Sequence, residues 1–123
     1  MLGTHRVTYD GDNSKITWEY NGSRQSIELK AANQYALDEQ TGFIIVLTGA
    51  HVVPDNLYLI SVEDGSCKSV QQPSGFAFYY LTNHSKLGVS VVCVSDDPVE
   101  GWRDWHFSFD PASNNLIRAI PAH

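Results

Sequence analysis

Four carboxylates and two tryptophans lie within the short segment SDDPVEGWRDW, residues 95–105, where Arg103 is the only basic side chain. Surface carboxylates attract lysine and arginine of a partner protein, and an exposed tryptophan provides an anchor that the partner can bury. We therefore expect a partner-binding loop here. Its residues are Asp96, Asp97, Glu100, Trp102, Asp104 and Trp105.

A simpler interpretation of this segment stays open. Pro98 and Gly101 favour turns, so an ordinary acidic loop would have the same composition, with Trp102 folded back onto the core. The exposure of Trp102 separates the two interpretations, because a recognition loop needs that indole to be accessible.

Catalytic patterns are not found in the sequence. It contains neither G-x-S-x-G nor a glycine-rich phosphate loop, and its five histidines lie far apart. His106 alternates with core positions, and we interpret it as a surface histidine. Asp104, Ser108 and Asp110 share its strand face, but steps of about 6–7 Å are too long for direct hydrogen bonds without side-chain reach. We expect neither an enzyme nor a cofactor.

Residues 10–14, DGDNS, are similar to the opening of a calcium loop, in which oxygen ligands alternate. Lys15 replaces the glycine that such a loop needs at its sixth position, and Asn21 replaces the acid at its twelfth. We interpret this segment as a turn and expect no metal site.

The charge balance narrows the class of partner. Fourteen acidic and eight basic side chains give a formal charge of −6, which repels phosphate backbones and anionic membranes and favours a basic protein. We predict no nucleic-acid or membrane partner. The 123 residues, 42% of them apolar, suit one globular domain over residues 1–123.

The N-terminus lacks the apolar run of a secretory signal, and no segment has the length and apolar character of a membrane span. We therefore expect a cytoplasmic protein. Cys67 and Cys93 lie in apolar, strand-like surroundings outside any metal spacing, and we predict two buried free thiols.

Alternating apolar and polar residues, bounded by turn residues, predict about ten to eleven strands and an all-β fold. Residues 43–47 are continuously apolar, which indicates a strand central in its sheet. Alternation in residues 75–82 places Phe76, Phe78 and Tyr80 on one face. The predicted strands are residues 4–10, 15–20, 24–30, 34–38, 43–48, 56–62, 67–71, 75–82, 88–95, 104–110 and 116–120.

The strands are expected to form an antiparallel meander of repeated three- to four-stranded units. Tight turns at Gly22, Gly65 and Asn114 recur at intervals similar to those of propeller blades. Three units are fewer than a closed propeller needs, so we expect an open, propeller-like stack, with a sandwich or partial barrel as alternatives. An open sheet edge could pair in a homodimer.

Small size, acidity and an all-β framework without catalytic groups give the whole chain a character that resembles the immunity proteins of bacterial toxin systems, including contact-dependent inhibition. The resemblance implies a cognate toxin, often a basic nuclease, whose active site the protein covers. The acidic segment would then stand in for substrate phosphates. The alternative is a small-ligand or glycan-binding β module, in which Trp102, Tyr79 or Tyr80 stacks on a sugar.

Overall fold

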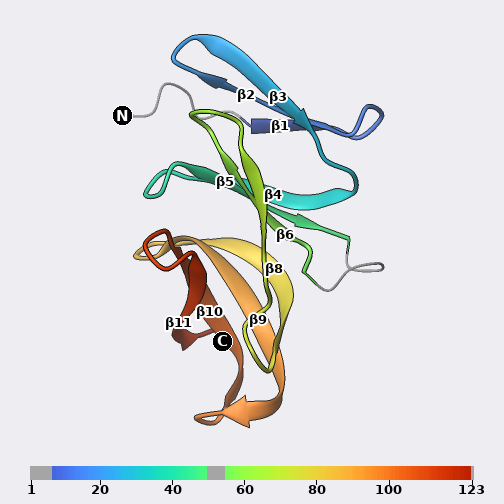
Figure 1. The fold of residues 1–123 in the computed structure, drawn as a ribbon. Helices are drawn as coiled ribbons and strands as arrows, with labels where there is room; N and C mark the ends of the chain where they lie inside the picture. Colours follow the sequence, from blue (N-terminus) through green and yellow to red (C-terminus); the bar gives the residue numbers. More distant parts are fainter. Residues whose placement is uncertain (1–6, 50–54, 123) are drawn as a thin grey trace.

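The computed structural model describes residues 7–49 and 55–122, and the regular structure in these residues is entirely antiparallel β-sheet (Figure 1). Residues 4–6 of the first predicted strand lie outside the described part. The strands are β1 (Val7–Asp10), β2 (Lys15–Tyr20), β3 (Ser23–Glu28), β4 (Ala32–Asp38), β5 (Phe43–Thr48), β6 (Leu57–Ser61), β7 (Cys67–Val70), β8 (Phe76–His84), β9 (Gly88–Val99), β10 (Trp102–Asp110) and β11 (Asn115–Pro121).

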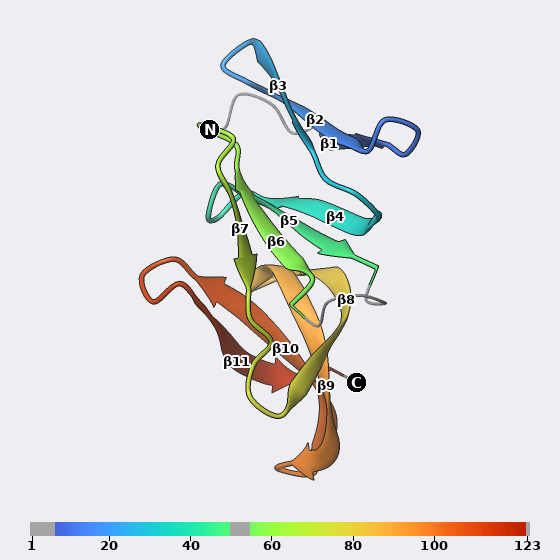
Figure 2. The same cartoon turned by 45° about the vertical axis from the view of Figure 1, so that its right-hand side comes forward.

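The strands form three meander sheets in chain order: sheet A (β1–β3), sheet B (β4–β7) and sheet C (β8–β11). Figures 1 and 2 show sheet B between the other two. The prediction of an all-β meander in three- to four-stranded units is confirmed, and among the described residues no sheet closes into a barrel. The strands predicted between repeat units, β4 and β8, are the first strands of sheets B and C.

Strand β5 is apolar because both of its faces are buried. Ile44 and Val46 pack with Trp18 in the layer between sheets A and B. Ile45 and Leu47, which point the other way, belong to the layer between sheets B and C. A strand covered on both faces loses the polar half of its alternation, so the prediction of a central position is confirmed.

Local turn chemistry sets the hairpins. Asn21 and Gly22 join β2 to β3 with φ values of 51° and 80°, the left-handed conformations that a two-residue hairpin turn requires. Asp10 closes the β1–β2 turn, where its carboxylate accepts hydrogen bonds from Asp12 N and from Asn13 Nδ2. The side-chain bond to Asn13 is the main cause of the lowered pKa of Asp10. The calcium-like segment is a turn, as predicted.

Polar contacts join sheet B to the other sheets. Trp18 Nε1 in sheet A donates to the backbone oxygen of Val62 at 3.0 Å. On the other side, the buried carboxylate of Asp38 accepts a hydrogen bond from Val89 N at 3.4 Å. Gly88 has a φ of 75°, and a Cβ there would lie 2.6 Å from Asp38 Oδ1. Only glycine allows the β8–β9 turn to approach this carboxylate so closely.

The two thiols differ in burial. Cys93 is buried in the layer between sheets B and C, which raises its pKa to about 12. Cys67 is free but exposed, so the prediction that it is buried was wrong. It begins β7, a four-residue strand at the edge of sheet B whose first three residues are all exposed. Its neighbours in sequence, Ser66 and Lys68, are polar and do not enclose it.

Candidate functional site

The acidic segment is a β-hairpin, and its prediction as a loop was wrong. Strand β9 continues to Val99 and β10 begins at Trp102, so only Glu100 and Gly101 form the turn. Both turn residues have positive φ, 51° and 87°, which suits a two-residue hairpin connection. We call residues 96–104 the acidic hairpin.

A large bulge interrupts this hairpin. It explains why the alternation of inward and outward side chains cannot be recognised in the sequence. Asp104 pairs with Val94 and Trp102 pairs with Val99, so residues 95–98 of β9 lie opposite Arg103 alone. The buried Ser95 donates its hydroxyl hydrogen to Asp97 O at 2.5 Å. A bulge breaks the period of two and bends the strand, so the extra residues look like a loop in the sequence.

The four carboxylates have different surroundings. Asp96 and Asp97 are exposed in the bulge and form no ion pair with another described residue. Asp104 is half-buried beside Val94. Glu100 is 2.7 Å from Arg118 Nη2, so the positive charge of β11 already offsets this acid. The bulge pair therefore carries the negative charge that is available to a partner.

The two tryptophans also separate. Trp102 has 42% of its surface exposed, as the recognition interpretation requires. Trp105 has only 5% exposed and packs in the layer between sheets B and C. Its indole donates to Trp102 O at 3.1 Å, and the Arg118 guanidinium lies 4.5 Å from its ring centroid. Trp105 thus supports the hairpin from within and offers a partner little surface.

His106 is held by a serine that sequence reasoning did not select. Ser90 Oγ lies 2.7 Å from His106 Nδ1, and the ring of His84 lies 5.1 Å away, centroid to centroid. Burial, and then the proximity of His84, lower the pKa of His106. Ser90 is fully buried, so its hydroxyl cannot reach a substrate. Among the described residues, neither Asp104 nor Asp110 forms a hydrogen bond with the ring.

The outer face of sheet C, turned away from sheet B, carries a row of large side chains. Tyr80 pairs with Val92, Val92 with His106, and His106 with Ile120, and opposed residues share a face. Ile117 pairs with Ser108 and lies on the same face. Tyr80, Ile117 and Ile120 are all exposed, although Val92 beneath them is fully buried.

Two register shifts create this face, and for this reason the sequence did not reveal it. A bulge at Tyr79 places Tyr80 outward, while Phe78 and Leu81 pack against the core. The prediction that Tyr80 shares a face with Phe76 and Phe78 was therefore wrong. A second bulge, between the pairs of His106 and Phe107, brings Ile117 and Ile120 to one face although they are three residues apart.

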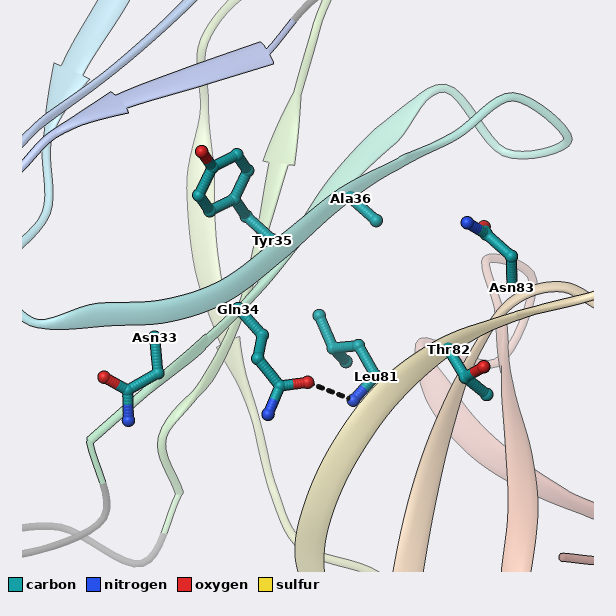
Figure 3. Close-up of a pocket in the computed structure, with 7 residues that line it drawn as sticks. All are labelled: Asn33, Gln34, Tyr35, Ala36, Leu81, Thr82 and Asn83. Carbon is teal, nitrogen blue, oxygen red and sulfur yellow. Dashed lines mark hydrogen bonds between the residues drawn. The ribbon is translucent and has the colours of Figure 1, made fainter.

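A hollow of about 350 Å³ separates the edge strands β4 and β8 (Figure 3). Gln34 Oε1 accepts a hydrogen bond from Leu81 N at 2.7 Å across it, so a side chain takes the place of a paired strand. Among the residues that the structure describes, no charged side chain lines the hollow. The lining residues are Asn33, Gln34, Tyr35, Ala36, Leu81, Thr82 and Asn83.

Comparisons with known proteins assign no relative: no family model, no curated protein and no solved structure matches the chain. Within residues 7–49 and 55–122, no three His, Cys, Asp or Glu side chains gather in a way that could hold a metal ion. The same residues contain no helix that is long and apolar enough to cross a membrane.

Proposed function

We propose that the protein is an immunity protein of the cytoplasm, which binds and neutralises a cognate protein toxin by covering its active site with the acidic hairpin. The observation that carries the proposal is the exposed Asp96–Asp97 pair in a fixed bulge beside the exposed Trp102. A basic nuclease is the toxin class that this surface suits, because its active site binds phosphates.

Carboxylates on a fixed stretch of backbone bind a basic site better than carboxylates on a mobile loop. Ser95 holds the bulge from inside, and the contacts of Arg118 with Glu100 and Trp105 hold the tip of the hairpin. Less conformational freedom is then lost when the partner binds. Asp96 and Asp97 would take the positions of substrate phosphates, while the net charge of −6 increases the rate of encounter with a basic protein.

The first experiment is co-expression with the protein encoded by the adjacent upstream gene, then co-purification and titration at low and high salt. We expect a stable complex that weakens with salt. The double substitution Asp96→Asn with Asp97→Asn should raise the Kd at least about tenfold.

A matched control removes the same charge elsewhere. Glu19→Gln with Glu28→Gln changes two exposed acids of sheet A and should leave the Kd within about twofold of the unchanged protein at physiological salt. Failure to form a complex would overturn the proposed function. Equal weakening by both pairs would show that net charge, rather than the hairpin, drives binding.

A glycan-binding module is the alternative, and the hollow between β4 and β8 favours it. Its amides can both donate and accept hydrogen bonds, as sugar hydroxyls require, and the exposed Tyr79 and Tyr80 rings lie 5.0 Å apart further along β8. Backbone NMR titration with neutral mono- and disaccharides would test it. Saturable chemical-shift changes of the Gln34 and Leu81 backbone amides, abolished in the Gln34→Ala variant, would support glycan binding.

A further inference from the structure

The outer face of sheet C has the composition of an interface. Its exposed large side chains are Tyr80, Ile117 and Ile120, and Tyr79 stands beside them at the bulge with 58% of its surface exposed. Exposed large apolar and aromatic side chains that gather on one face of a sheet are a feature of interaction sites. Aromatic side chains are also enriched at the centres of protein interfaces.

The opposite end of the molecule shows that such exposure is not general to this fold. The outer face of sheet A is polar throughout, and its charges lie opposite charges of the other sign: Lys15 lies between Asp10 and Glu28, and Glu19 faces Arg24. A face of that kind is stable in water. Each of the two sheets covers one face of sheet B, so covering the core does not require isoleucine and tyrosine on the outside of sheet C.

The exposed side chains on the outer face of sheet C lie beside fully buried residues of the same face. Val92 and Ser90 are fully buried on this same face, so the neighbouring side chains close over them. The contact between Ser90 and His106 and the approach of the His84 ring fix the middle of the row. A partner would thus meet side chains that are already ordered, which lowers the entropy lost on binding.

We infer that the outer face of sheet C forms the apolar centre of a partner interface and that the acidic hairpin forms the rim of the same interface. The partner is a basic protein whose contact surface has an apolar or aromatic centre bordered by lysine and arginine. This inference rests on the proposed function. Asp104 joins the two regions, because it belongs to the hairpin and lies two residues before His106 on the same face of β10.

Charge decides between this partner and a second copy of the chain. Asp104 and Asp110 lie on the outer face near opposite ends of β10, on either side of the apolar row. Two copies packed face to face would bring these acids and the nearby Asp96 and Asp97 close to their counterparts, at a cost in repulsion. A basic border on the partner neutralises them. Apolar contact and charge complementarity then favour the same complex.

The test compares Ile120→Lys with Ser26→Lys in titrations against the protein encoded by the adjacent upstream gene. Both substitutions place one lysine on an exposed position of an edge strand, in β11 of sheet C and β3 of sheet A. Ile120→Lys should raise the Kd about 30-fold or more, as for an interface hot spot, and Ser26→Lys should change it less than about threefold. Urea unfolding of both variants checks that each is folded.

Hydrogen exchange of the complex gives a second measurement without substitution. Protection on binding should cover β10, β11 and residues 80–84, and leave β1–β3 unchanged.

Binding that is weakened by the Asp96 and Asp97 substitutions but not by Ile120→Lys, with protection confined to the hairpin, would overturn this inference and keep the proposed function. A complex that fails to form would remove both. A free chain that sediments as a dimer, and as a monomer after Ile120→Lys, would assign the face to a second copy instead.

Discussion

Sheets A and C cover opposite faces of the same central sheet, yet they present different surfaces to solvent. The outer face of sheet A carries opposed charges such as Glu19 and Arg24, whereas that of sheet C carries Tyr80 and Ile120. The inner faces of sheets A and C have the same role, since each completes one layer of the core. The comparison teaches that packing on the core constrains the inner face of a covering sheet and leaves the composition of its outer face free.

The two ends also differ in how they are attached. Within residues 7–49 and 55–122, six buried residues form the core cluster between sheets A and B, and eleven form the cluster between sheets B and C. Sheet A therefore depends more heavily on its one large anchor, Trp18, which also donates the hydrogen bond to Val62. Sheet C is held by more apolar contacts and by the Asp38 carboxylate.

The largest expected effect breaks the attachment of sheet A. Trp18→Ala should lower the free energy of unfolding by about 3–5 kcal/mol, because it opens a cavity and leaves the Val62 carbonyl without its donor. Urea unfolding followed by circular dichroism measures this. Trp102→Ala is the control, since that indole is 42% exposed, and should cost less than about 1 kcal/mol. Equal losses of unfolding free energy in the Trp18→Ala and Trp102→Ala variants would contradict the anchoring role of Trp18.

The next effect concerns the attachment of sheet C. Gly88→Ala should lower the free energy of unfolding by about 2–4 kcal/mol, because a Cβ there meets Asp38 Oδ1 and because the φ is positive. Gly75 has a similar φ of 82° but open space around it, so Gly75→Ala should cost only about 1 kcal/mol. The difference isolates the contact with Asp38. Similar losses in both variants would show that backbone strain alone matters.

Lowering the pH should have a smaller effect on stability, through His106 on the outer face of sheet C. The pKa of His106 is lowered in the folded protein from its ordinary value of 6.5, so the unfolded chain binds the proton more readily. Stability should therefore fall as the pH drops below about 6.5, as His106 protonates preferentially in the unfolded state. Urea midpoints between about pH 7.5 and pH 5 should show this decrease. A variant with His106→Gln that loses stability just as steeply would refute the assignment to His106.

The smallest effect concerns the tip of the acidic hairpin. Glu100→Gln should change the free energy of unfolding by less than about 0.5 kcal/mol, because both partners of the ion pair are accessible to water. Arg118→Ala should cost about 1 kcal/mol, since the guanidinium also stacks on Trp105. Chemical denaturation of the two variants provides the comparison. A larger loss for Glu100→Gln than for Arg118→Ala would contradict this view of the stacking.

Sequence reasoning located the described strand ends to within two residues, except at the end of β9. β2 and β5 have the predicted bounds because their side chains alternate, or are uniformly apolar, over their whole length. β9 and β10 extend beyond the predictions because residues 95–98 bulge out of the ladder. The acids of the candidate site were found from composition alone. Its supports, Ser95 and Arg118, were not, because neither belongs to a recognisable pattern.

The sequence by itself determined the all-β fold, the approximate positions of the strands, their antiparallel connections and the central place of β5. These features depend on local chemistry: the period of two, turn residues that accept positive φ, and the burial that a wholly apolar strand needs. Only the tertiary structure decided which side chains share the outer face of sheet C. That face depends on register, and bulges in β8 and β11 each shift the alternation by one residue. Exposure of Trp102 and burial of Trp105 were likewise decided by packing between sheets.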